Sequence, residues 1–361
     1  MGALASERVR VAVVGASGYT GAELLRLLVG HPRVTLTIVT SEKSAGQPVA
    51  SVFPHLTSIL PLSFEALAPD SLPARADVVF LALPHTKAMP AAAVCLAMGL
   101  RVIDLSADFR LSDPALYAQW YETAHQQPGL LKEAVYGLPE LHRDAIRNTR
   151  LVAAPGCYPT AAVLQLAPLV ARHLVQADGL LIDAKSGVSG AGRSPALPYH
   201  FPEAHESVEA YKVGRHRHIP EIEQELTVLA ARRSGGATAA GVRVLFIPHL
   251  VPMNRGILST AYARLTQSLT QNDVASLYQD FYKGESFVRL QSSPSAISPR
   301  HVRGSNYCDI AIVADPRSNW VVTVAALDNL VKGAGGQAIQ AMNLMLGFPE
   351  NLGLTSPAVF P

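Results

Sequence analysis

Cys157 is the residue whose setting best suits covalent chemistry. It follows a Pro-Gly turn and precedes a predicted helix over 160–170, while an apolar strand over 150–154 leads into the turn. A helix N-terminus stabilises negative charge, and a free thiol has a pKa of about 8.5, so this setting favours the thiolate near neutral pH. The alternative is a buried cysteine that packs as a small hydrophobe. The Pro-Gly-Cys-x-Pro turn favours a side chain held out for reaction.

A candidate for proton transfer is the segment His216-Arg-His218, which is followed by Pro220 and Glu221. Pro220 suits the first turn of a helix, which places His218 exposed near the cap, with Glu221 close enough to orient its ring. An imidazole there can take the thiol proton and later return it. The alternatives are a solvated surface pair or half of a metal site. The sequence offers no third ligand, so it predicts no metal.

Three glycines, Gly15, Gly18 and Gly21, stand between a predicted strand over 9–14 and a predicted helix over 22–28. Glycines let the backbone approach a pyrophosphate, and the helix N-terminus supplies amide donors. An ordinary glycine-rich turn is the alternative, but the strand and the helix on either side favour a dinucleotide site. The side chains of this loop that can add hydrogen bonds are Ser17, Tyr19 and Thr20.

The end of the second predicted strand, over 34–39, indicates which dinucleotide binds. NAD sites place an acidic residue there to hold the ribose hydroxyls. Here Ser41, Lys43 and Ser44 can receive a 2′-phosphate, which a carboxylate would repel. Glu42 lies among them, but its side chain should point away from Ser41 and Lys43 if the strand continues. The sequence therefore favours NADP as the cofactor.

Two loops offer groups suited to an anionic substrate. Arg110 ends the loop 104–110, which follows a predicted strand, and it can clamp a phosphate. The glycine-rich segment 185–193 offers backbone amides and ends at Arg193. For each arginine the alternative is a turn with surface charge. The hydroxyls of the second loop that can bind substrate are Ser186 and Ser189.

The first half of the chain alternates predicted strands and helices, which is typical of a parallel, doubly wound sheet. Beyond the elements already given, it has strands over 77–83 and 101–105 and a helix over 86–98. The second half has strands over 179–185, 242–250, 257–265, 308–314 and 320–327, with helices near 220–233 and 273–282. The prediction is an α/β fold: a Rossmann-type parallel sheet plus an α+β domain with a mixed sheet. A last helix, over 335–346, should dock on the first domain.

Composition and charge restrict the function classes. With 361 residues the chain is too long for one compact core, so two domains are expected. A net charge of +2 without a basic run gives no support for nucleic-acid or membrane partners. Prolines interrupt the apolar stretch 151–171, which therefore reads as strand, turn and buried helix. The three cysteines are scattered, and Cys95 and Cys308 should pack in the core. The few cysteines and the lack of a signal-peptide pattern favour the cytoplasm.

Together these motifs resemble the N-acetyl-γ-glutamyl-phosphate reductase family, in its longer type-1 form. The Pro-Gly-Cys-Tyr-Pro-Thr and His-Arg-His motifs are the specific part of the resemblance, whereas the glycine loop alone is not. The resemblance extends over nearly the whole chain. The matching segments are 15–24, 82–85, 104–110, 136–140, 155–160, 185–192, 216–222 and 328–333.

The resemblance implies an NADP-binding Rossmann domain over 1–156, completed by a C-terminal helix within 331–361. It also implies a catalytic and oligomerisation domain over 157–330, like that of aspartate-semialdehyde dehydrogenase, in subunits that assemble as homodimers or homotetramers. Cys157 becomes the nucleophile, and His218 is favoured as the base over His216, which then binds substrate. Four further residues of the matching segments are implied to bind the cofactor: Leu83, Pro84, Gly187 and Asn329.

The implied substrate is a small acyl phosphate. The Cys157 thiolate attacks N-acetylglutamyl phosphate, phosphate leaves, and NADPH reduces the thioester to N-acetylglutamate semialdehyde in arginine biosynthesis. Three alternatives stay open: a reductase of carrier-linked aminoadipate phosphate in lysine synthesis, aspartate-semialdehyde dehydrogenase, and a non-catalytic dinucleotide-binding regulator. The Pro-Gly-Cys-Tyr-Pro and His-Arg-His forms favour the acetylglutamyl enzyme over the second alternative. A regulator would need no reactive thiol.

Overall fold

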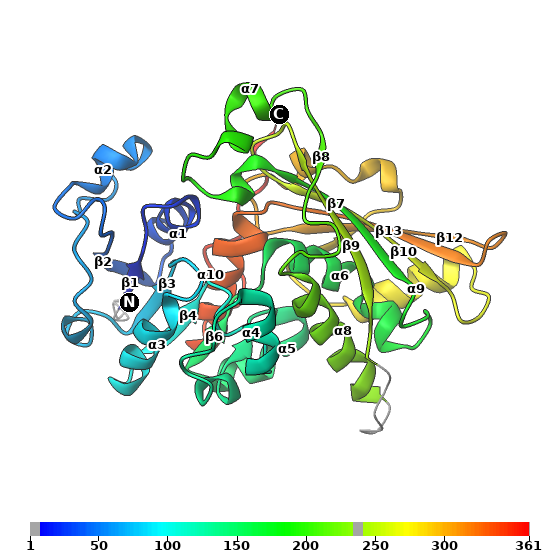
Figure 1. Cartoon of the computed structure of the whole chain (residues 1–361), viewed down its shortest axis with the longest axis horizontal. Helices are drawn as coiled ribbons and strands as arrows, with labels where there is room; N and C mark the ends of the chain where they lie inside the picture. The colour runs from blue at the N-terminus through cyan, green and yellow to red at the C-terminus, as the bar shows by residue number, and fades with distance from the viewer. Residues whose placement is uncertain (1–7, 234–240, 361) are drawn as a thin grey trace, which may run out of the picture. The chain divides into compact units, whose positions relative to one another are not determined.

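The computed structural model describes residues 8–233 and 241–360. The chain divides into two compact units, each with its own sheet (Figure 1). One unit comprises the chain up to Pro155 together with Ala334–Thr355, and the other comprises Gly156–Gly333 together with the chain from Ser356 on. A parallel sheet in one unit and a mixed sheet in the other confirm the predicted fold class.

The first unit is built around a six-stranded parallel sheet. Its strands are β1 (Val9–Val14), β2 (Val34–Val39), β3 (Val78–Leu81), β4 (Arg101–Asp104), β5 (Val135–Tyr136) and β6 (Leu151–Ala153). They lie in the order β2-β1-β3-β4-β6-β5. All of β3 and the last four residues of β1 are buried, as expected for apolar strands covered on both faces. The strand order reverses at β1, and open α/β sheets bind ligands at such a point.

The first unit also contains helices. They are α1 (Tyr19–Val29), α2 (Val49–Val52), α3 (Ala88–Ala97), α4 (Pro114–Tyr121), α5 (Pro139–Asn148) and α10 (Gly336–Met345). On one face Ala12, Val79 and Val102 pack into a hydrophobic cluster with residues of α3 and α4. The wholly buried α10 packs against α1 and α5, so the last helix belongs to the first unit (Figure 1).

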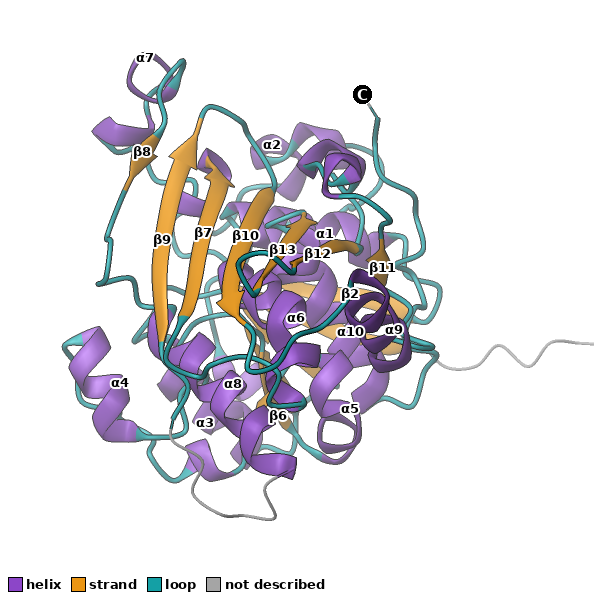
Figure 2. Ribbon diagram, turned by 90° about the vertical axis from the view of Figure 1, so that its right-hand side faces the viewer, coloured by secondary structure: helices purple, strands orange, loops and turns teal. Residues whose placement is uncertain are grey.

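The second unit contains a seven-stranded mixed sheet. Its strands are β7 (Leu180–Gly187), β8 (Glu209–Ala210), β9 (Val244–Val251), β10 (Ile257–Arg264), β11 (Val288–Leu290), β12 (Cys308–Asp315) and β13 (Trp320–Leu327). They lie in the order β11-β12-β13-β10-β7-β9-β8, and Figure 2 shows β9, β7 and β10 side by side. The pairs β7–β9 and β11–β12 are parallel and the other pairs are antiparallel. The strands β12 and β13, consecutive in the chain, pair as an antiparallel hairpin.

Helix α6 (Cys157–Ala171) is the apolar centre of this unit, because every residue over 158–170 is buried. It packs against β10, β13 and two further helices, α8 (Ile219–Arg233) and α9 (Gln271–Phe281). A short helix, α7 (Phe201–Ala204), lies in the segment before β8. The charge-free stretch 151–171 is thus a strand, a turn and a core helix, and within the described residues no helix is long and apolar enough to cross a membrane.

Several boundaries differ from the prediction. Helix α1 begins at Tyr19 instead of Ala22, and α6 begins at Cys157 instead of Thr160. Glycine and proline in these first turns conceal the helical period, although a helix tolerates both at its start. The strands β5, β8 and β11 were not predicted, because two or three residues carry no detectable period.

Candidate active site

Cys157 is the first residue of α6, so its side chain stands at the positive end of a helix whose N-cap is Gly156. It is half-buried, whereas Cys95 and Cys308 are buried. Burial raises the pKa of the Cys95 thiol to about 11. Cys95 and Cys308 pack in the core, as predicted, and Cys157 is the most accessible of the three thiols.

The imidazole of His218 packs directly on the residue before this cysteine. A β-carbon placed on Gly156 would stand 2.4 Å from Nε2 of His218 and 2.8 Å from its Cε1. Only glycine therefore lets the ring approach the start of α6 so closely. The sequence suggested an exposed histidine, which is wrong: only 16% of the His218 side chain is exposed, because the ring fills the space above Gly156.

Glu221 joins the same two partners from the first turn of α8. Its carboxylate is fully buried, and Oε1 accepts a hydrogen bond from the Gly156 amide at 2.8 Å. Its other oxygen, Oε2, lies 4.0 Å from Nε2 of His218. The imidazole and the carboxylate thus meet at Gly156, the residue directly before Cys157 in the chain. The carboxylate can orient the ring there.

His216 has a different environment from His218. Desolvation, followed by the charges of Lys212 and Arg217, lowers the pKa of His216 to about 4. Its Nδ1 accepts a hydrogen bond from the His218 amide at 3.2 Å, and its ring meets the buried Tyr158 edge-on at 5.6 Å. His216 is therefore neutral near pH 7, and its contacts position the residue that the sequence favoured as the base.

The segment after β13 also reaches Cys157. A β-carbon on Gly333 would stand 2.8 Å from Cβ of Cys157, so this glycine gives the segment room to pass the cysteine. The packing roles of Gly156 and Gly333 were not predicted. Both residues lie inside motifs that the sequence analysis quoted, but a motif does not reveal contacts between segments far apart in the chain.

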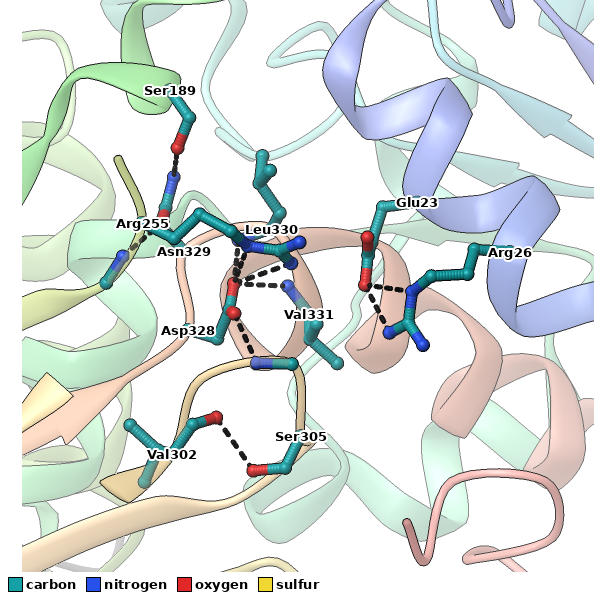
Figure 3. Close-up of polar contacts among 12 residues, drawn as sticks. Glu23, Arg26, Ser189, Arg255, Val302, Ser305, Asp328, Asn329, Leu330 and Val331 are labelled. Carbon is teal, nitrogen blue, oxygen red and sulfur yellow. Dashed lines mark hydrogen bonds and ion pairs between the residues drawn. The ribbon is translucent and has the colours of Figure 1, made fainter. Parts of the chain in front are cut away.

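Asn329 links the loop 185–193 to the start of β10 by hydrogen bonds (Figure 3). Its Nδ2 donates to Oγ of Ser189 at 3.0 Å, and its Oδ1 accepts from the Gly256 amide at 2.6 Å. Gly187 has no room for a side chain, because a β-carbon there would lie 2.8 Å from the Arg255 amide nitrogen. The structure thus brings Asn329 and Ser189 together. Ser186 is buried and donates to the Gly187 carbonyl, and Arg193 is exposed.

In the first unit, the glycine loop has the geometry of a tight strand-to-helix turn. Gly15 has φ +81°, and a β-carbon there would stand 2.8 Å from the Ala82 carbonyl oxygen and 2.9 Å from a methyl carbon of Leu83. Gly21 allows α1 to pass close to Ala16, while a β-carbon on Gly18 would meet nothing within 4 Å. The loop therefore leaves open space at its centre, as a pyrophosphate requires. Around it, Ser17 and Thr20 are half-buried, Pro84 is exposed, and Tyr19 is 40% exposed.

The strand β2 has the predicted bounds, Val34–Val39. The strand stops at Val39, and the chain turns after Ser41, so alternation along a strand does not determine where Glu42 points. Ser41 is buried and donates to Oγ of Ser17 at 3.0 Å, which links this end to the glycine loop. Lys43 is exposed and Ser44 is half-buried.

Arg110 is buried against the backbone. Its Nε donates to the Ala154 carbonyl at 2.8 Å, and its Nη2 donates to the Leu105 carbonyl at 3.0 Å. These bonds attach the loop 104–110 to the residues that follow β6. The role of Arg110 as a phosphate clamp stays a prediction.

Comparison with known proteins defines the class. The family model of the semialdehyde dehydrogenase NAD binding domain matches residues 10–149, and that of the semialdehyde dehydrogenase dimerisation domain matches residues 157–329. The chain is therefore an oxidoreductase of the semialdehyde dehydrogenase class, with an NAD(P)-binding domain. Within that class it belongs to the N-acetyl-γ-glutamyl-phosphate reductase family, which confirms the resemblance seen in the sequence.

Relatives with that name are similar over their whole length. Those from Geotalea daltonii and Geobacter metallireducens are 54% and 52% identical to this chain, over 98% of it and 100% of their own length. Solved structures share the fold at lower identity. Aspartate semialdehyde dehydrogenase with NADP from Candida albicans has a TM-score of 0.70 at 16% identity, covering 96% of this chain and 100% of that one. Aspartate semialdehyde dehydrogenase II from Vibrio cholerae has a TM-score of 0.68 at 15% identity, covering 95% and 99%.

Proposed function

We propose that this protein catalyses the NADPH-dependent reduction of N-acetyl-L-glutamyl 5-phosphate to N-acetyl-L-glutamate 5-semialdehyde and phosphate, in arginine biosynthesis. Identity above 50% to full-length relatives named for this reaction supports the proposal. The observation that carries it is the contact of His218 and Glu221 with Gly156, the residue directly before Cys157. A non-catalytic regulator would have no use for that arrangement.

The Cys157 thiolate attacks the acyl carbon of the substrate. The S–C bond forms, the C–O bond to phosphate breaks, and phosphate leaves with the bonding electrons to give a thioester. The helix N-terminus favours the thiolate that this step requires. We assign the substrate contacts around this step to Arg110, Ser186, Ser189, Arg193 and His216.

His218 holds the proton that the thiol gives up. After reduction of the acyl group, its C–S bond breaks, the aldehyde forms, and His218 returns the proton to the sulfur. Glu221 keeps the ring in place and stabilises it while it carries positive charge.

The first unit fits a dinucleotide, because the glycine loop is open at Gly18 and tightly turned at Gly15. When bound, NADPH supplies the hydride. We assign its binding to the loop 15–21, to Leu83 and Pro84, and to Gly187 and Asn329. Ser41, Lys43 and Ser44 would receive the 2′-phosphate. The Candida albicans structure that shares this fold was solved with NADP, which is consistent with this choice.

Lys43→Ala tests the choice of NADP over NAD. Lys43 is exposed at the end of β2, so its loss should raise KM for NADPH about tenfold and leave KM for NADH unchanged. Lys132→Ala, at another exposed lysine of the same unit, is the matched control and should change neither value. Equal effects of Lys43→Ala on both cofactors would refute the assignment.

The reverse reaction tests the function itself. Purified protein should reduce NADP with N-acetyl-L-glutamate semialdehyde only when inorganic phosphate is present, because phosphate must release the acyl group from sulfur. Aspartate semialdehyde and the carrier-linked aminoadipate semialdehyde are the comparison substrates. Faster phosphate-dependent turnover of either would overturn the proposal and favour the corresponding alternative.

The match to a dimerisation domain indicates an oligomer. We propose a homodimer or homotetramer in which a second copy covers the outer face of the second sheet, where Leu181, Leu245, Tyr262 and Val313 are exposed. Leu245→Lys should shift the mass measured by light scattering towards the monomer. The outer-face proposal fails if the mass does not change.

Two other predictions are kept as proposals. The domains are an NADP-binding domain over 1–156, completed by 331–361, and a catalytic domain over 157–330. The compartment is the cytoplasm, where the three free cysteines would stay reduced.

A further inference from the structure

A pocket in the second unit lies outside the residues assigned to the reaction. Its volume is about 470 Å³, within the range of small-molecule sites. The turn after β9 forms one side, and the segment around a 3₁₀ turn, η7 (Pro299–His301), forms the other. The lining residues are Met253, Asn254, Arg255, Ser298, Pro299, Arg300 and Arg303.

The lining is strongly basic. Three of its seven residues are arginines, none of the seven is acidic, and Ser298 and Asn254 supply further hydrogen-bonding groups. Arg300 is exposed, Arg303 is half-buried, and 24% of the Arg255 side chain is exposed. The guanidinium group presents its donors in a planar fork that matches phosphate and carboxylate oxygens. Three arginines in the lining of a cavity of this size suit a small anion.

Arg255 is held in place by a buried carboxylate. Oδ1 of Asp328 accepts from Nη2 of Arg255 at 3.1 Å and from its Nε at 3.3 Å (Figure 3). Asp328 is fully buried, and its Oδ2 accepts from the Gly304 amide at 2.6 Å. This pair neutralises one of the three arginine charges and holds its side chain in the absence of a ligand.

The C-terminal segment supports the other side of the pocket. The Val359 amide donates to the Arg303 carbonyl at 2.9 Å, and the Phe360 ring lies 5.9 Å from the Arg300 guanidinium carbon. A ring at that distance can orient a guanidinium by a cation–π contact. Asp328 and Phe360 thus contact the Arg255 and Arg300 side chains, and Val359 holds the backbone of Arg303.

We propose that this pocket binds a small anion that carries phosphate or carboxylate groups, at a site separate from the thiol. None of the lining residues belongs to the proposed substrate or cofactor contacts. The pocket is nevertheless joined to them, because the Arg255 backbone packs on Gly187, and Asp328 also accepts from the Leu330 amide at 2.9 Å beside Asn329. A bound anion would compete with Asp328 for Arg255 and disturb the loop 185–193 through Asn329 and Ser189.

The test uses the full chain and inorganic phosphate as the probe, with binding measured by calorimetry. The double variant Arg300→Ala/Arg303→Ala should raise the Kd for phosphate at least tenfold. Arg317→Ala, at an exposed arginine of the β12–β13 hairpin, is the matched control and should leave it unchanged. Arg193→Ala alters the proposed substrate site, where phosphate can also bind. This variant should leave the Kd of phosphate at the pocket unchanged.

Wild-type affinity in the double variant, or the same loss in Arg193→Ala, would overturn the proposal. If the double variant does not fold, Arg300→Lys/Arg303→Lys keeps the charge but not the fork, and it should weaken binding by a smaller factor. N-acetyl-L-glutamate, used in place of phosphate, shows whether the pocket prefers carboxylate or phosphate ligands. If the wild-type protein binds neither probe, the site is refuted.

A second measurement rests on the proposed function. Phosphate should raise KM for NADPH less in the double variant than in the wild type, because phosphate, a product of the proposed reaction, still binds the substrate site in both proteins. If phosphate binds the wild-type pocket in calorimetry but changes KM for NADPH equally in both proteins, only the connection between the pocket and the loop 185–193 is refuted. An inactive protein that still binds phosphate would refute the proposed function and leave the pocket.

Discussion

The ring of His218 rests on the α-carbon of Gly156 so closely that a single β-carbon would stand 2.4 Å from its Nε2. Gly156 also donates its amide to Glu221 at 2.8 Å and immediately precedes Cys157. Gly156 therefore contacts both the proposed base and its carboxylate partner, directly before the proposed nucleophile in the chain. The absence of a side chain at this position is a geometric requirement of the site.

Gly156→Ala should displace His218 without straining the backbone. Gly156 has φ −67° and ψ 154°, which alanine adopts readily, so the change is purely steric. A shift of the ring by about 1 Å should lower kcat on the order of 100-fold, since reacting groups must stay aligned. Steady-state kinetics measures kcat, and calorimetry with NADPH shows whether cofactor binding persists, as we expect.

Gly129→Ala is the control for the loss of a glycine. Gly129 has φ −61°, and a β-carbon there would meet nothing within 4 Å. We expect wild-type kcat for it. Wild-type kcat for Gly156→Ala as well would show that the His218 position does not matter to the rate.

The two histidines should respond differently to substitution. His218→Asn removes the proposed base and should lower kcat by about 10² to 10⁴. His216, whose pKa is lowered to about 4 mainly by burial, is neutral at pH 7 and cannot take a proton there efficiently. His216→Asn should therefore reduce kcat much less, and a larger loss in this variant would reverse the assignment. Both variants are compared by kcat at pH 7 and by NADPH affinity.

The sequence was sufficient to predict the two sheet types, the strand-to-helix glycine turn and the candidate nucleophile. Each of these depends on local period or on residues adjacent in the chain. The contacts of His218 with Gly156 and of Gly333 with Cys157 join segments distant in sequence, and no local pattern encodes them. The bounds of β2 were predicted correctly, but the pairing of Thr40 with Glu65 beyond its end was not predicted.

Selective alkylation should identify Cys157. Cys95 and Cys308 are buried, and the Cys95 pKa of about 11 leaves almost no thiolate at pH 7. Iodoacetamide at pH 7 should therefore label Cys157 in the folded protein, with loss of activity in proportion to labelling. Peptide mass spectrometry locates the label. N-acetylglutamyl phosphate should protect against it, and equal labelling of Cys95 or Cys308 would contradict the assigned accessibility.

Asp104 should make the stability of the protein depend on pH in a defined window. Its carboxyl is fully buried, and burial raises its pKa to about 7, although the Ser106 hydroxyl bonded to it at 2.7 Å opposes the shift. The folded state therefore keeps a proton that the unfolded chain, with its ordinary pKa of 3.8, releases. This contribution to the free energy of unfolding is complete below pH 3.8, falls as the pH rises, and is lost above about pH 7.

Asp104→Asn keeps a neutral group at this position, so its stability should not follow that curve. Between pH 5 and 7 the wild type should lose about 1.4 kcal/mol per pH unit relative to the variant, and the difference should level off above pH 7. Urea unfolding at pH 5, 6, 7 and 8 measures it. Asp77, whose pKa is lowered because its carboxylate is hydrogen-bonded to Arg10, titrates below this window, so Asp77→Asn should differ from the wild type by a constant amount. A constant difference for Asp104→Asn as well would mean that its carboxyl is ionised throughout, stabilised by Arg110 and Ser106 against the cost of burial.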